Sequence, residues 1–247
     1  MWRHTPSAAR DDALLDRERR SPRWSFIVER LEATFGAVAE LETVELGSGR
    51  GDLSVLLAER GARVTLLDAS DKALDQARRR FDRLDLPARF ARADLLGPLD
   101  LWRDRFDLAL SSGVIEHFRG AERTQALRAH WTVIRHGGAA IVSVPNAWCL
   151  PYRLWKLYLE LRGWWPYGTE VPYAKSELLR RACDSGFEAV EACCIGFWQS
   201  VGDHLGRSLL GGGPDWIDRP SPLDGIMGMS LLLWGRRPQA TDPEGKR

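Results

Sequence analysis

Long apolar runs and an excess of one charge are both missing from this sequence, and each absence excludes a class of protein. In 247 residues, no apolar stretch approaches the roughly 20 residues that a membrane-spanning helix needs. The first residues, with Arg3, Arg10 and Asp11, lack the apolar centre of a signal peptide. The formal net charge is +1 and the charges are mixed, so we expect no nucleic-acid partner.

Cysteine and metal-ligand patterns are equally sparse. The spacings of the four cysteines match no metal-binding motif; they are Cys149, Cys183, Cys193 and Cys194. Unpatterned cysteines are typical of a reducing compartment, so we expect a cytoplasmic protein without a metal site. The densest basic run, 78–80 with Arg83, has acidic neighbours and is predicted to be a solvated helix face.

What the sequence does contain is a glycine-rich turn at 47–51. Gly47, Gly49 and Gly51 follow an apolar strand-like run at 42–46 and precede an amphipathic stretch at 53–60. Glycine allows positive φ and a close approach of the backbone to a ligand, and a helix N-terminus presents unpaired N–H groups. A dinucleotide fingerprint would need glycine where Asp52 stands, and the Gly-Lys-Ser/Thr of a P-loop is absent.

Strand-like and helix-like segments alternate along residues 24–145, which predicts an α/β fold with a parallel sheet. The expected strands there are 42–46, 63–68, 88–93, 106–111 and 139–144. The expected helices there are 24–35, 53–60, 71–84 and 124–134. Beyond Pro145 we expect helices at 151–162 and 176–183 and strands at 187–195 and 229–234.

Acidic residues stand at the carboxyl ends of the predicted strands, where ligands bind in open α/β sheets. At the end of the second strand, Asp68 can accept hydrogen bonds from ribose hydroxyls. Asp94, after the third, can accept from an adenine amino group, and Leu95 can pack on the purine ring. Glu45 can help to hold an ammonium group. The alternative interpretation is that Asp68 and Asp94 cap the turns that follow them.

These motifs together resemble those of the class I S-adenosylmethionine (SAM)-dependent methyltransferases, and most closely the small-molecule subgroup that includes quinone-biosynthesis enzymes. The stretches that carry the likeness are 44–52, 66–70, 92–95 and 106–118. The resemblance implies a Rossmann-like seven-stranded sheet of order 3-2-1-4-5-7-6 with the last strand antiparallel. It also implies SAM as cofactor and S-adenosylhomocysteine (SAH) as product.

Carried over by position, the resemblance implies a set of cofactor-binding residues. The three glycines would line the methionine and ribose end, and Ser112 and Gly113 would contact the methionine moiety. The full expected set is Glu45, Gly47, Ser48, Gly49, Gly51, Asp68, Ala69, Asp94, Leu95, Ser112 and Gly113.

Methyl transfer needs a base only if the acceptor must lose a proton, and His117 is the candidate. It follows the fourth strand, and an imidazole has a suitable unperturbed pKa near neutral pH. Alternatively, His117 orders its loop. The adjacent Glu116 is expected to be structural.

The chain has eleven tryptophans, which cluster late in the sequence. Six of them lie in two predicted substrate-side insertions, at about 147–173 and 196–225 of a methyltransferase domain spanning 41–237. A helical segment at 1–40 is expected to pack on that domain, and 238–247 to be disordered. The stretch 150–165 interleaves Trp and Tyr with Arg and Lys. It is therefore open to interpretation as core packing, a lid, or a peripheral membrane contact.

The sequence thus predicts a SAM-dependent methyltransferase acting on a small, lipophilic or aromatic acceptor, with O-methylation favoured and C or N left open. Two alternatives remain. One is a SAM-binding, methyltransferase-like partner protein that no longer catalyses, and the other is an NAD-dependent oxidoreductase. The oligomeric state is left open.

Overall fold

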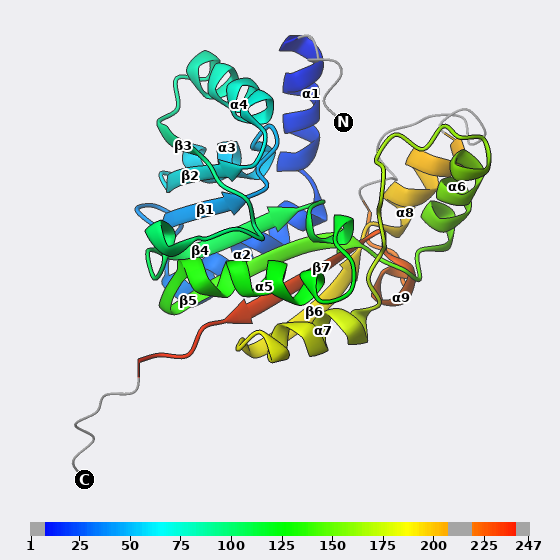
Figure 1. The fold of residues 1–247 in the computed structure, drawn as a ribbon. Helices are drawn as coiled ribbons and strands as arrows, with labels where there is room; N and C mark the ends of the chain where they lie inside the picture. Colours follow the sequence, from blue (N-terminus) through cyan, green and yellow to red (C-terminus); the bar gives the residue numbers. More distant parts are fainter. Residues whose placement is uncertain (1–7, 207–218, 241–247) are drawn as a thin grey trace.

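The computed structural model describes residues 8–206 and 219–240, which are built around one seven-stranded sheet (Figure 1). The strand order is β3-β2-β1-β4-β5-β7-β6, and β7 runs antiparallel to both of its neighbours. This confirms the predicted fold class. The strands are β1 (Glu42–Leu46), β2 (Arg63–Asp68), β3 (Ala88–Arg92), β4 (Phe106–Ser112), β5 (Ile134–Pro145), β6 (Glu188–Ile195) and β7 (Ser230–Arg236).

Helices cover both faces of the sheet and form two apolar cores. One core packs α5 and α7 against the strands, and the other packs α2, α3 and α4 against the opposite face. The longer helices are α1 (Ala8–Arg19), α2 (Pro22–Phe35), α3 (Asp52–Glu59), α4 (Asp71–Arg83), α5 (Glu122–Val133), α6 (Leu150–Leu161) and α7 (Lys175–Asp184). The short elements are η1 (Asp100–Trp102), η2 (Ile115–His117), α8 (Phe197–Ser200), η3 (Val201–Gly206) and α9 (Asp224–Met227).

Local capping explains where several helices begin. The hydroxyl of Ser70 accepts a hydrogen bond from the Ala73 N–H and so starts α4. Ser21 does the same for α2 through the Trp24 N–H, with Pro22 at the first helical position. Both helices therefore begin within two residues of the positions that the sequence predicts.

The start of β5 was predicted wrongly. We expected a helix to run to residue 134 and end at Gly137 and Gly138, with the strand beginning at residue 139. Instead α5 ends at Val133 and β5 begins at once, because Ile134 pairs with Phe106 of β4. The register then shifts before Ala139 pairs with Leu108, so the glycines form an irregularity within a strand.

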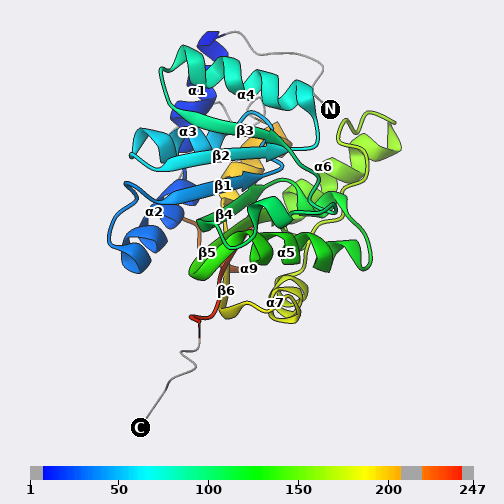
Figure 2. The same cartoon turned by 60° about the vertical axis from the view of Figure 1, so that its left-hand side comes forward.

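Short helical elements, α8, η3 and α9, occupy parts of 196–225, where the sequence suggests only turns. Residues 207–218 of that insertion, and most of the predicted disordered tail at 238–247, lie outside the described residues. At the other end of the chain, α1 lies against α3 and α4 in both views (Figures 1 and 2). In Figure 1, α6 stands apart from the sheet, on the far side from β3.

Candidate active site

The glycine turn after β1 adopts a backbone that only glycine accommodates readily. The φ angles of Gly47, Gly49 and Gly51 are 68°, 54° and 70°. A Cβ atom at Gly51 would lie 2.5 Å from a methyl carbon of Leu66, and one at Gly47 would lie 2.8 Å from the side chain of Val114. The turn is therefore constrained both by its dihedral angles and by close packing.

A cleft of about 340 Å³ opens beside this turn, at the carboxyl ends of the adjacent strands β1 and β4. β1 and β4 are neighbours in the sheet although they are not consecutive along the chain. Open α/β folds bind ligands at such a point, where the strand order reverses. Its lining combines predicted and unpredicted residues: Arg23, Glu45, Gly47, Ser48, Gly49, Arg50, Asp52, Leu53, Ser112, Gly113, Glu116, His117, Tyr167 and Glu170. The predicted residues Gly51, Asp68, Ala69, Asp94 and Leu95 lie outside this lining.

Asp68 nevertheless contacts the turn directly. One carboxylate oxygen accepts a hydrogen bond from the Gly49 N–H at 2.9 Å, and the other accepts from the Ser70 N–H at 2.8 Å. Asp94 accepts from the Leu96 N–H at 2.9 Å, as in a simple Asx turn. Leu95 is only 7% exposed and belongs to one of the apolar cores. Asp68 therefore fixes the glycine turn, whereas Asp94 shapes its own turn.

Glu45 is a buried carboxyl group at the floor of the cleft. It accepts hydrogen bonds from the Ser54 hydroxyl at 2.6 Å and from the Ser54 N–H at 3.2 Å. Burial raises the pKa of Glu45 to about 8, although the bonds from Ser54 act in the opposite direction. Glu45 is therefore largely protonated at neutral pH until a cation comes close.

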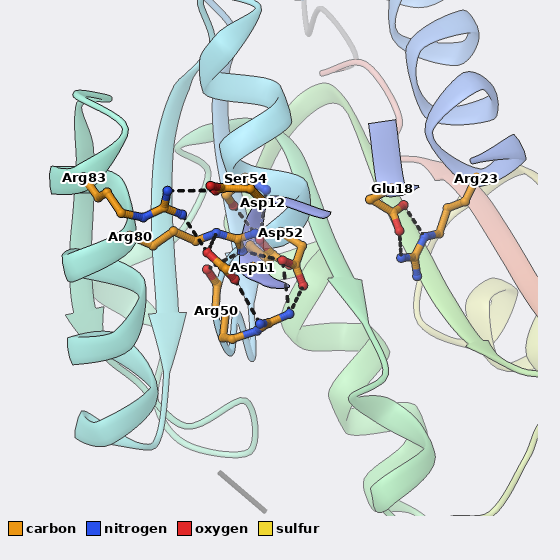
Figure 3. Close-up of polar contacts among 10 residues, drawn as sticks. Asp11, Asp12, Glu18, Arg23, Arg50, Asp52, Ser54, Arg80 and Arg83 are labelled. Atoms are coloured by element: carbon orange, nitrogen blue, oxygen red, sulfur yellow. Dashed lines mark hydrogen bonds and ion pairs between the residues drawn. The ribbon is translucent and has the colours of Figure 1, made fainter. Parts of the chain in front are cut away.

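Arg23 is a cleft residue that the sequence analysis missed. It lies in the first turn of α2, and its guanidinium donates to the Ser112 hydroxyl at 2.7 Å. It also donates to the Glu18 carboxylate at 2.8 Å (Figure 3). Ser112 stands 89 positions further along the chain, so no local pattern relates the two. The proline at the start of α2 marks the helix but gives no sign that the next side chain enters the cleft.

A cluster of charged side chains joins α1 to the cleft (Figure 3). Asp11 of α1 lies within 3.0 Å of nitrogen atoms of Arg50, Arg80 and Arg83. Asp52 pairs with Arg80 and Arg50 on the other side. Because the Arg80 side chain is only 4% exposed, the predicted solvated face at 78–83 is wrong for this residue. The sequence analysis missed the pairing because Asp11 is far from its partners along the chain.

The opposite wall of the cleft carries groups suited to acceptor chemistry. The Thr169 carbonyl oxygen lies 2.6 Å from His117 Nδ1. A carbonyl oxygen only accepts, so Nδ1 carries the proton and neutral His117 presents Nε2 as an acceptor. Glu116 is 2% exposed, and its Oε2 has no hydrogen-bond partner among the described residues. Burial raises the pKa of Glu116 to about 8.

Glu170 completes this wall and accepts a hydrogen bond from the Tyr152 hydroxyl. Within 8–206 and 219–240, no three His, Cys, Asp or Glu side chains are grouped to hold a metal ion. In the same part of the chain, no helix is both long and apolar enough to cross a membrane. The cleft thus offers the guanidinium of Arg23 and the buried carboxyl of Glu45 at one end and the Nε2 atom of His117 at the other.

Sequence comparison identifies residues 44–138 as a methyltransferase domain. Curated relatives include the ubiquinone biosynthesis O-methyltransferase of Methylobacterium sp., 30% identical over 152 residues that cover 60% of each chain. The protein of that name from Ruegeria pomeroyi is 31% identical over 162 residues, 62% of each chain. The chain therefore spans about three fifths of the length of these relatives.

Solved structures with the same fold cover more of the chain at lower identity. The magnesium protoporphyrin IX methyltransferase of Synechocystis PCC 6803, with bound SAH, has a TM-score of 0.62 at 16% identity, covering 95% of this chain and 89% of its own. A [4+2]-cyclase has a TM-score of 0.57 at 14% identity, covering 87% of this chain and 80% of its own. Since both identities are low, these likenesses establish the fold alone. The matched domain at 44–138, the strand order and the glycine turn are together those of the class I SAM-dependent methyltransferase fold.

Proposed function

We propose that this protein transfers the methyl group of SAM to an oxygen atom of a small, lipophilic or aromatic acceptor. The observation that carries the proposal is the single cleft shared by the glycine turn, Ser112 and Gly113 on one side and by His117 on the other. The O-methyltransferase names of the curated relatives support oxygen over carbon or nitrogen. The four free cysteines are compatible with the cytoplasmic location we infer.

The charges at the floor of the cleft fit the amino-acid end of SAM. Glu45 offers a carboxyl group for an ammonium, and Arg23 offers a guanidinium for a carboxylate. Arg23 also reaches Ser112, which the family resemblance assigns to the methionine moiety. A zwitterion of this kind therefore finds an opposite partner for each of its charges.

At the nucleoside end, we assign ribose to Asp68 and the adenine side to Ala69, Asp94 and Leu95. Each carboxylate oxygen of Asp68 accepts one hydrogen bond from an N–H group, and each retains a second lone pair that can accept from a ribose hydroxyl. Because Leu95 is only 7% exposed, the adenine ring would contact only the edge of its side chain. Asp94 is exposed and keeps one carboxylate oxygen outside its turn bond.

When bound, SAM supplies an already activated methyl carbon, so the protein must align the acceptor and manage its proton. His117 is oriented for the second task, because the Thr169 carbonyl holds the tautomer that leaves Nε2 free. We propose that Nε2 accepts the proton of the acceptor hydroxyl. Glu116 stands beside it as a carboxyl that is neutral below about pH 8, able to donate a hydrogen bond to the acceptor.

The test is calorimetric titration with SAH, followed by transfer of labelled methyl from SAM to phenols of graded lipophilicity. We expect SAH to bind and the more lipophilic phenols to be methylated best. Heat with NAD and none with SAH would establish the oxidoreductase alternative. Tight SAM binding without transfer to any acceptor, in a stable complex with another protein, would establish the non-catalytic alternative.

The Asp68→Ala variant tests the cofactor assignment directly. Losing the carboxylate removes two main-chain contacts and leaves the ribose hydroxyls unpaired, so we expect SAH to bind about tenfold to a hundredfold more weakly. Asp75→Ala is the control, because Asp75 lies on the exposed side of α4 and pairs with Arg78. Unchanged SAH affinity in Asp68→Ala would contradict the assignment.

A further inference from the structure

The outer face of α6 is apolar although it faces solvent. Leu150, Leu154, Leu157 and Leu161 are separated by four, three and four residues, so they form one stripe along the helix. Each is between 52% and 79% exposed. The opposite side of α6 buries Tyr152 and the stem of Lys156. This helix therefore exposes its leucines and buries a lysine, the reverse of an ordinary surface helix.

Further apolar side chains extend the stripe beyond both ends of the helix. Trp148 precedes α6 and Trp164 follows it, and they are 68% and 60% exposed. Buried Asn146 accepts a hydrogen bond from the Trp148 N–H and donates one to the Ile226 carbonyl oxygen. Ile226, in α9, is 71% exposed. We call this set the leucine face: Trp148, Leu150, Leu154, Leu157, Leu161, Trp164 and Ile226.

The charges around the leucine face are mainly positive. Between residues 148 and 169 there are three basic residues and one acidic residue, Glu160. Glu160 is paired with Lys156 at 2.6 Å. Arg153 and Arg162 are exposed, and the guanidinium of Arg162 lies 5.2 Å from the ring centre of Trp164. An anionic partner surface would therefore complement the border of the face.

We propose that the leucine face docks on an anionic lipid surface, with α6 lying in the plane of the membrane. Leucines in one stripe, tryptophans at both ends and arginines beside them match the layers of a lipid interface: acyl chains, the polar boundary and charged headgroups. A twelve-residue helix is about 18 Å long, too short to span a bilayer but long enough to lie in its surface.

The position of the leucine face relative to the cleft connects membrane docking with access of the acceptor to the cleft. The chain runs from Trp164 directly to Tyr167 and Glu170, which line the cleft. An apolar acceptor dissolved in the membrane could therefore pass from the lipid to the cleft without crossing bulk water. This step rests on the proposed function, whereas the docking itself does not.

Vesicle co-sedimentation of the full chain tests the proposal. We expect binding to vesicles of phosphatidylglycerol and phosphatidylcholine, and weaker binding to phosphatidylcholine alone. The double variant Leu154→Glu/Leu157→Glu should lower the partition coefficient at least tenfold, because two anchoring leucines become anions. Arg162→Glu should weaken binding several-fold on anionic vesicles only.

Leu101→Glu is the matched control, since Leu101 is 84% exposed but precedes β4, at the opposite end of the strands. It should bind vesicles like the parent protein. Calorimetry with SAH on every variant verifies that the fold is retained, and it separates failure of the docking from failure of the proposed cofactor site.

Two outcomes would overturn the proposal. The first is equal recovery of the parent and the double variant with anionic vesicles. The second is concentration-dependent self-association in size-exclusion chromatography that the double variant abolishes, without vesicle binding by the parent. That result would assign the leucine face to a second copy of the chain.

Discussion

The two sides of the molecule that carry the walls of the cleft use arginine and leucine in opposite ways. On the β1–β3 side, Arg80 is buried among aspartates, and the leucines of α3 are core residues. On the α6 side, Arg162 lies over exposed aromatic rings, and leucines face solvent. The first wall is fixed by interactions within the chain, whereas the leucines and aromatic rings of the second face solvent.

This difference corresponds to the two ligands that we propose. A cofactor of constant shape suits a wall that is fixed in advance by buried ion pairs and a strained glycine turn. An apolar acceptor suits a wall in which Tyr167 follows a helix whose leucines are open to an apolar phase. The following changes separate the two walls, starting with the one expected to have the largest effect.

His117→Ala should damage the chemistry without damaging the cofactor site. Loss of an oriented base is expected to lower kcat about a hundredfold to a thousandfold, with SAH affinity unchanged. His136→Ala is the control, because His136 contacts Pro238 near the opposite end of β5. A kcat within twofold of the parent, with the same pH profile, would remove His117 from the reaction.

Arg80→Met should affect folding instead of chemistry. It leaves Asp11 and Asp52 without their most buried partner, so the free energy of unfolding should fall by about 3 kcal/mol. Arg78→Met is matched in chemistry but exposed, and it should change the unfolding free energy by about 0.5 kcal/mol or less. Urea denaturation measures both. Equal losses of unfolding free energy in the two variants would show that the buried cluster stabilises the fold no more than an exposed ion pair does.

The buried carboxyls predict a pH dependence of stability in the ligand-free protein. Burial raises the pKa of Glu45 and of Glu116 to about 8, above the values of unfolded glutamate. The folded state thus binds more protons, so stability is full at low pH and is lost as the pH rises through 8. We expect a loss of about 2 kcal/mol per group between pH 6 and 9.

Urea denaturation at pH 6, 7, 8 and 9 measures this loss. Glu45→Gln should flatten part of the curve, and Glu116→Gln another part. Stability that is constant or rises across this range in the parent would contradict the raised pKa values.

Arg23→Gln should have the smallest effect and the most selective one. Removing the guanidinium should weaken SAH binding about tenfold, through the lost contact to the amino-acid carboxylate. Methylthioadenosine lacks that carboxylate, so its affinity should not change. Arg30→Gln, which loses an exposed pair with Glu191 and a contact with the Phe26 ring, should affect neither ligand. Equal weakening of both ligands would indicate general damage to the cleft.

The sequence could predict the fold and the turn because both depend on local patterns. Apolar runs specify buried strands, and the alternate glycines indicate a turn within a few residues, although the close packing of Gly51 on Leu66 is not visible there. The start of β5 was not predicted, because pairing between Ile134 and Phe106 overrides the break that the following glycines indicate. At Ile134 a tertiary contact, and not the local sequence preference, determines the secondary structure.

The site was only partly predictable for the same reason. Glu45, Ser112 and His117 lie at or after the carboxyl ends of strands and could be placed in order, and all three line the cleft. Arg23 and the cluster around Asp11 could not, because their partners lie far away in sequence. The pattern of α6 identifies an apolar stripe, but only the assembled chain shows which side of the helix meets solvent.

Asn146 links the parts of the α6 side to one another. Its side-chain amide donates to the carbonyl oxygens of Ile226 and Gly228, and its oxygen accepts from the Trp148 N–H. Its backbone bridges to Tyr173, whose hydroxyl donates to the Ile115 carbonyl oxygen beside Glu116. An aspartate here would turn two attractive contacts into repulsions. One isosteric exchange at a single atom would thus release α9 from this anchor, while the contacts to Trp148 and to Tyr173 remain.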